Sequence, residues 1–87
     1  MEKLVKILNE SGLHARPTAV FVKTASGFKS EIKIEVKGNC LNGKSIMNVL
    51  SLGAKKGEEI KIIANGPDED EAVQCLVQLI ESKFGEE

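Results

Sequence analysis

The chain is short and close to electrically neutral. Its 87 residues include 12 lysines and arginines against 13 aspartates and glutamates, for a formal net charge of −1. A chain of this length supports one small hydrophobic core, so we expect a single domain over residues 1–87. The charge balance argues against a nucleic-acid interface, which needs a basic face, and favours a protein partner or a small anion.

The cysteines and the single histidine show no spacing that is typical of a metal site, so no bound metal is expected. Cys40 and Cys75 lie far apart in apolar segments and are predicted to be core thiols. No run approaches the roughly 18 apolar residues of a membrane span, and the N-terminus leads directly into a strand-like segment instead of a signal peptide. We therefore expect a cytoplasmic protein without membrane insertion.

The hydrophobic pattern predicts strands and helices along the whole chain. Residues 4–8 are apolar enough for a partly buried strand, and residues 15–26 repeat apolar side chains at the spacing of a helix packed on a sheet. Residues 31–37 then alternate between charged and apolar side chains, which is typical of a strand. The pair Gly38-Asn39 supplies a tight turn into a short strand at residues 40–42.

The second half of the chain continues this alternation. Ser45 is predicted to be the N-cap of a short helix over residues 46–50, and Gly53 ends that helix. Residues 59–64 have the alternating pattern of a last strand.

A final helix is predicted after the last strand. Asp68 and Glu71 have the spacing of a capping box at its start, and its apolar repeat ends near Phe84-Gly85. The element order is therefore βαββαβα. We expect an α+β fold, an open-faced β-sandwich with a four-stranded, mainly antiparallel sheet and three helices on one face.

The only histidine lies in the run Gly12-Leu13-His14-Ala15-Arg16-Pro17, where a glycine loop leads into a helix start. Proline is favoured in the first helical turn, so His14 is expected at or just before a helix N-terminus. The helix dipole attracts a phosphoryl group there, and Arg16 adds a guanidinium suited to phosphate oxygens. The run predicts that His14 is a phosphorylatable nucleophile, although a histidine in a turn is more commonly a solvated or capping residue.

A second run, Lys44-Ser45-Ile46-Met47-Asn48-Val49-Leu50-Ser51-Leu52-Gly53, decides between these interpretations. Together the two runs resemble the signatures of the HPr family, the histidine-containing phosphocarriers of the phosphoenolpyruvate:sugar phosphotransferase system. The resemblance covers the whole chain and implies the same fold. It also implies a monomeric carrier with no bound cofactor of its own. The carrier accepts a phosphoryl group from enzyme I on Nδ1 of His14, stabilises it with Arg16 and donates it to a sugar-specific enzyme IIA.

The short helix carries more apolar side chains than one sheet face can cover. They occupy nearly its whole circumference: Ile46, Met47, Val49, Leu50 and Leu52. Scattered exposed apolar residues are one interpretation. The resemblance implies another, a partner-docking patch made of Ile46, Met47 and Leu50, with Lys23 and Lys44 as charges at its rim.

Ser45 has two compatible interpretations. As an N-cap it stabilises the helix by about 1 kcal/mol. The resemblance implies that it can also be the target of an HPr kinase/phosphorylase, with a catabolite-control transcription regulator as a further partner, because a phosphate there would add charge to the docking patch. Asn48 and Thr18 stand where the family usually has glycine and alanine, so contacts around Asn48 are the least transferable.

Three functional classes are open from the sequence. The favoured one is the phosphocarrier. The second is a regulatory paralogue that acts by protein–protein interaction, either a nitrogen-branch protein or a catabolite-repression co-effector. The third is a small enzyme with His14 as general base, which ranks last because no motif places a second reactive group beside it.

Overall fold

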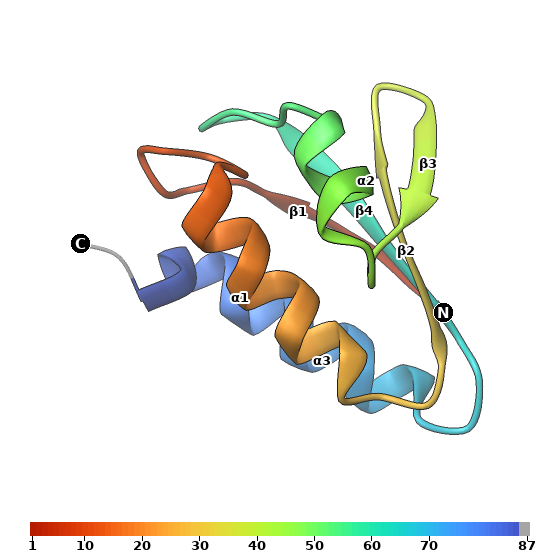
Figure 1. The fold of residues 1–87 in the computed structure, drawn as a ribbon. Helices are drawn as coiled ribbons and strands as arrows, with labels where there is room; N and C mark the ends of the chain where they lie inside the picture. Colours follow the sequence, from red (N-terminus) through yellow and green to blue (C-terminus); the bar gives the residue numbers. More distant parts are fainter. Residues whose placement is uncertain (86–87) are drawn as a thin grey trace.

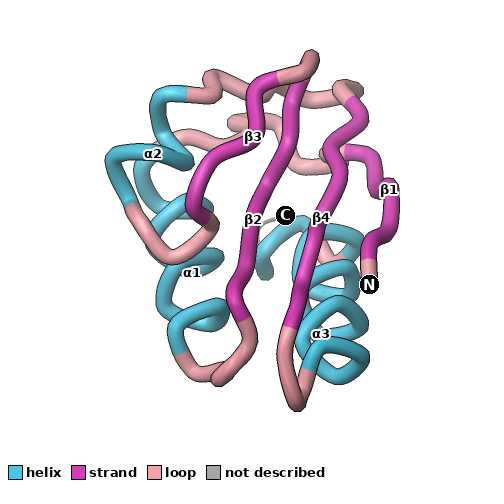
Figure 2. The backbone as a smooth tube through the Cα atoms, turned by 90° about the vertical axis from the view of Figure 1, so that its right-hand side faces the viewer, coloured by secondary structure: helices cyan, strands magenta, loops and turns pink. Residues whose placement is uncertain are grey.

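The structure, a computed structural model, describes residues 1–85 and consists of an antiparallel sheet with helices on one face (Figures 1 and 2). The elements are β1 (Glu2–Lys6), α1 (Ala15–Ser26), β2 (Glu31–Val36), β3 (Asn39–Asn42), α2 (Ile46–Ser51), β4 (Glu59–Asn65), α3 (Glu69–Glu81) and the 3-10 turn η1 (Lys83–Gly85). The predicted βαββαβα order and the open-faced sandwich are therefore confirmed.

The four strands lie in the order β1-β4-β2-β3, and every neighbouring pair is antiparallel. The register between β2 and β4 places Ile34 opposite Ile62, and the register between β1 and β4 places Val5 opposite Ile60. All four of these side chains are buried. The alternation in each strand thus gives the sheet one apolar face, on which the helices pack.

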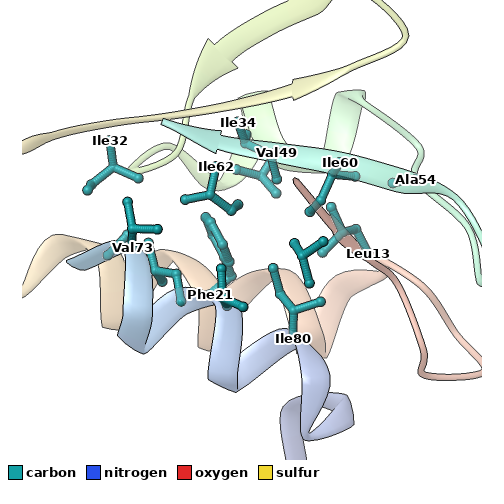
Figure 3. Close-up of a cluster of buried hydrophobic side chains, with 14 of the residues drawn as sticks. Leu13, Phe21, Ile32, Ile34, Val49, Ala54, Ile60, Ile62, Val73 and Ile80 are labelled. Carbon is teal, nitrogen blue, oxygen red and sulfur yellow. The ribbon is translucent and has the colours of Figure 1, made fainter. Parts of the chain in front are cut away.

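The core lies between that face and the helices. In Figure 3 the isoleucines of β2 and β4, such as Ile32 and Ile62, point towards Phe21 of α1 and towards Val73 and Ile80 of α3. Each of these side chains is buried. The apolar stripes of α1 and α3 therefore face the sheet, as their helical spacing predicts.

The prediction that both cysteines are core thiols is wrong. Cys40 is exposed and Cys75 is half-buried. In the register between β2 and β3, Cys40 lies opposite the charged residue Glu35, on the sheet face that the helices leave open. The apolar residues around Cys40 in the sequence did not indicate this outward position. The face on which a strand residue lies depends on the alternation of side chains along the strand.

Several predicted boundaries also differ by one or more residues, and two of these differences have a local structural cause. The first strand ends at Lys6, because the backbone of Ile7 bonds to the loop before β4, donating to Glu58 O and accepting from Gly57 N. The last helix ends at Glu81 instead of near residues 84–85, because Lys83, the residue after the C-cap Ser82, adopts a positive φ of 61°. Phe84 follows in η1 with a φ of 55°, and its side chain still packs into the core.

The predicted capping box at α3 does not form. Asp68 occupies the N-cap position, but its carboxylate accepts hydrogen bonds from Lys29 N and Ser30 N, each at 2.9 Å, and from the Ser30 hydroxyl. Glu69, not Glu71, reaches back, accepting from Gly66 N at 3.2 Å. Asp68 therefore joins the start of α3 to the loop between α1 and β2.

This contact predicts a specific dependence of stability on pH. The Ser30 hydroxyl, followed by the Lys29 amide, lowers the pKa of Asp68 from 3.8 to about 2. Because the folded-state pKa is the lower one, the contribution is present above the ordinary pKa and is lost as the pH falls through about 2. We expect Asp68→Asn to lower the free energy of unfolding at pH 7, with a difference from wild type that shrinks between about pH 4 and pH 2. Urea unfolding across this range measures it, and a constant difference would contradict the account.

Thr18 offers a stability prediction of the opposite sign. Its side chain is fully buried, and its hydroxyl has no hydrogen-bond partner among the described residues. We expect Thr18→Val, which replaces the hydroxyl by a methyl group, to raise the free energy of unfolding by about 1 kcal/mol. Thr18→Ser keeps the hydroxyl and is the control, which should bring no gain. A Thr18→Val variant that unfolds at lower urea than wild type would show that the hydroxyl is satisfied in solution.

Candidate functional site

His14 lies at the N-cap position of α1, directly before Ala15. Its backbone is extended, with φ −84° and ψ −171°, and its side chain makes no capping hydrogen bond. The residue is exposed. The predicted place at a helix N-terminus is confirmed, and the imidazole is accessible to a partner instead of being used to close the helix.

The first turn of α1 presents donors beside this imidazole. Thr18 N donates to His14 O at 3.0 Å, and Pro17 has no N–H, so the amides at this helix end are those of Ala15 and Arg16. Arg16 is exposed and forms no ion pair within residues 1–85. Its guanidinium and the helix end therefore make the surroundings of His14 favourable for an anion.

The loop before His14 is held against the segment that follows α2. Leu13 N donates to Ala54 O at 2.9 Å, and the Leu13 side chain is buried in the core (Figure 3). Gly12 has a φ of +62°, and a Cβ atom there would lie 2.5 Å from Ala54 O and 2.8 Å from Lys55 Cα. Only glycine fits this approach, which fixes the path of the chain into His14.

We expect Gly12→Ala to lower the free energy of unfolding by about 2 kcal/mol or more, because backbone strain and a clash with backbone atoms add. Gly53→Ala is a matched control, since Gly53 has the same φ of +62° but nothing within 4 Å of the added Cβ. That variant carries the strain alone and should lose about 1 kcal/mol. Urea unfolding of both measures the difference; equal losses would mean that the approach to Ala54 is not tight.

Helix α2 packs against α1 (Figures 1 and 2). Its apolar side chains are partly buried in the core and partly exposed. Val49 is fully buried, and Leu52 packs at the edge of the core. Met47, Ile46 and Leu50 are 82%, 47% and 39% exposed. These three side chains form an exposed apolar patch on α2. The segment that follows α2 contains Ala54, whose carbonyl accepts from Leu13 N in the loop before His14.

The two lysines predicted at the rim of this patch differ in exposure and in their contacts. Lys23 is exposed in the last turn of α1. Lys44 is half-buried, and its Nζ donates to Phe28 O at 2.7 Å, just past the C-terminus of α1. Its charge is therefore held by a backbone carbonyl, which leaves Lys23 as the more accessible of the two charges.

Ser45 is the N-cap of α2, as its position in the sequence predicts. Its Oγ accepts from Asn48 N at 3.3 Å, and the residue is half-buried. Ser45 directly precedes Ile46, which begins α2 and belongs to the apolar patch. A charge added at this hydroxyl would therefore lie next to apolar surface.

Asn9 is a buried polar residue in the loop before His14, and the sequence pattern does not single it out. It is 1% exposed and lies between β1 and α1. The available signal in the sequence was a polar residue that directly follows the apolar strand segment.

Within residues 1–85 no group of three or more metal-ligating side chains occurs. None of the helices in that part of the chain combines the length and the apolar character needed to cross a membrane.

Comparison with known proteins assigns the chain to a family. The family model described as PTS HPr component phosphorylation site matches residues 1–82. The phosphocarrier protein HPr of Neisseria meningitidis serogroup A (serotype 4A, strain DSM 15465 / Z2491) is 43% identical over 86 residues, which cover 99% of this chain and 97% of that protein. The chain belongs to the HPr family. The matched relative is a phosphocarrier and the family model is that of a component of the phosphotransferase system, so the predicted family and its general carrier role are supported.

Solved structures agree with this assignment. The crystal structure of HPr-C-His from Thermoanaerobacter tengcongensis is 53% identical in sequence and matches with a TM-score of 0.97, over 100% of this chain and 98% of that one. Crh, the catabolite-repression protein of Bacillus subtilis, is 39% identical and matches with a TM-score of 0.77 over 91% of both chains, in a structure described as a dimer with a swapped domain. Carriers and regulatory relatives thus share this fold.

Proposed function

We propose that this protein carries a phosphoryl group on Nδ1 of His14, taking it from enzyme I, which is itself phosphorylated by phosphoenolpyruvate, and donating it to a sugar-specific enzyme IIA in carbohydrate uptake. The observation that carries the proposal is an exposed imidazole that makes no capping hydrogen bond at the N-terminus of α1, with a guanidinium two residues later that forms no ion pair within residues 1–85. The protein needs no cofactor of its own for this step. We propose that it works as a single-domain, cytoplasmic monomer, in which one chain supplies both the acceptor and the apolar patch.

The chemistry follows from the groups around His14. A neutral imidazole attacks the phosphorus in line, the bond to the donor breaks, and negative charge is spread over the three equatorial oxygens. The amides of Ala15 and Arg16 and the Arg16 guanidinium are placed to stabilise that charge. Because these groups are at the surface, the same arrangement allows a second partner to approach and remove the phosphoryl group.

The exposed patch of Ile46, Met47 and Leu50 suits the docking of both partners in turn. An apolar surface of this kind gains free energy when a partner covers it. Met47, the most exposed of the three, has a flexible and polarisable side chain that adapts to different partner surfaces. Lys23 adds a positive charge that would attract acidic partner residues.

Phosphorylation of Ser45 by an HPr kinase/phosphorylase would regulate this docking. The modification replaces the capping hydroxyl by a group of roughly two negative charges beside the patch. Such a form would bind enzyme I less well and could instead bind a catabolite-control transcription regulator. The proposal rests on the position of Ser45 between its cap to Asn48 N and the apolar residue Ile46.

A regulatory paralogue is the second candidate function. The similarity of the chain to Crh, a catabolite-repression protein, is the observation that supports it. It would act through Ser45 and the patch, and phosphorylation of His14 would not be required. A protein of the nitrogen branch would use the same acceptor with different partners. Retention of His14 in this setting favours the carrier.

The carrier is tested by incubating the protein with phosphoenolpyruvate, magnesium and an enzyme I, followed by intact mass measurement. We expect one acid-labile phosphoryl group, which leaves the protein when an enzyme IIA is added. A protein that stays unmodified here, yet gains an acid-stable phosphate from a serine kinase, would be the regulatory paralogue.

A further inference from the structure

Asn9 begins the loop between β1 and α1, and its side chain is buried there. Its Nδ2 donates to Gly12 O at 2.8 Å and to Ser11 Oγ at 3.2 Å. Its backbone carbonyl accepts from Gly12 N at 3.1 Å. One residue therefore holds both the N–H and the C=O group of Gly12.

The Gly12 carbonyl belongs to the same planar peptide unit as Leu13 N, which donates to Ala54 O at 2.9 Å. That unit is thus fixed from both sides, its oxygen by the Asn9 side chain and its N–H by the segment after α2. His14 follows immediately. The orientation of this peptide sets the direction in which the chain enters α1 and hence where the imidazole stands relative to the helix end.

We propose that Asn9 is a positioning residue for phosphoryl transfer at His14, acting by fixing the Gly12–Leu13 peptide. The inference rests on the proposed phosphocarrier function. Asn9 is 1% exposed, so it acts through Gly12 and does not touch the phosphoryl group. Displacing a reacting group by about 1 Å can reduce a rate by a factor on the order of 100.

Two substitutions isolate the donor. Asn9→Ala removes the amide and leaves Gly12 O without it. Asn9→Asp keeps the shape of the side chain, but at neutral pH it replaces the Nδ2 donor by an oxygen that faces the Gly12 carbonyl. Asn9→Ser, with a shorter hydroxyl donor, is a milder variant in case both of the others fail to fold. All three leave the patch on α2 and the residues of the α1 N-terminus unchanged.

The experiment measures the rate of phosphorylation by enzyme I and phosphoenolpyruvate at increasing concentrations of each variant whose folding urea unfolding has verified. We expect kcat to fall about tenfold or more in the Asn9 variants, while KM stays within about twofold, because docking is intact. The backbone amide NMR signals of Leu13 and His14 should shift as well. Val73→Ala, a truncation at a buried site on α3, is the control for lost stability alone and should keep the wild-type kcat.

Folded Asn9 variants that transfer at the wild-type kcat, or that change KM alone, would overturn the inference. A failure of the proposed function looks different, because the wild-type protein itself would then not be phosphorylated. In the expected outcome wild type and Val73→Ala transfer equally and the Asn9 variants are slow.

Discussion

We expect His14→Ala to abolish acceptance of the phosphoryl group from enzyme I, and Arg16→Ala to retain acceptance but slow it by about tenfold to 100-fold. The first variant removes the proposed nucleophile, and His14 is the single histidine of the sequence. The second removes a charged donor to the phosphate oxygens, worth about 1.5–3 kcal/mol in the transition state, while the helix amides stay. Both residues are exposed, so the fold should be unaffected in either variant.

Single-turnover transfer from phosphorylated enzyme I measures both effects. Arg16→Lys is the matched control, because it keeps the positive charge without the planar fork and should transfer at an intermediate rate. A His14→Ala protein that still takes up an acid-labile phosphoryl group would show that the acceptor lies elsewhere.

Ser45→Asp is expected to weaken the binding of enzyme I by about tenfold or more, or about 1.4 kcal/mol. The carboxylate brings charge next to Ile46, and partner residues that dock on the apolar patch would have to desolvate it. Aspartate is itself a good N-cap, so the free energy of unfolding should hardly change. Calorimetric titration of enzyme I gives the affinity.

Ile46→Ala and Met47→Ala should also weaken this binding, because they remove docking surface without adding charge. Leu4→Ala is the matched control for Ile46→Ala: Leu4 is 55% exposed, against 47% for Ile46, and lies opposite Lys61 on the open face of the sheet. Lys61 itself is a poorer control, because it is half-buried and its Nζ lies 3.6 Å from a Glu2 carboxylate oxygen. Equal affinities for wild type, Ser45→Asp and Ile46→Ala would mean that α2 takes no part in docking.

Features that depend on consecutive residues were predictable from the sequence. Pro17 in a first helical turn located His14 at the N-terminus of α1, and Ser45 before a short apolar run located the N-cap of α2. The alternation in residues 31–37 gave the buried face of β2, although the strand itself ends one residue earlier, at Val36. Each of these signals arises from local backbone preferences, which act within a few residues.

Features that depend on distant partners were not predictable in this way. Asp68 has the local signature of a cap, but its carboxylate bonds to backbone groups 38 and 39 residues away. Lys44 is predicted to be a charge at the rim of the patch, and no local signal indicates that its Nζ donates to a carbonyl 16 residues earlier. The burial of Asn9 and the close approach of Gly12 to Ala54 likewise depend on how two loops meet. Patterns of neighbouring residues contain no information on such tertiary contacts between distant segments.

The central claim is that the phosphoryl group is bonded to an imidazole nitrogen of His14. The most direct test is NMR of the ¹⁵N-labelled protein after phosphorylation by enzyme I and phosphoenolpyruvate, which detects the nitrogen that is coupled to phosphorus. The account predicts coupling to Nδ1 of His14 and its disappearance on brief acid treatment. A phosphate that shows no coupling to a ring nitrogen and survives acid, bonded for example to Ser45 Oγ, would contradict it.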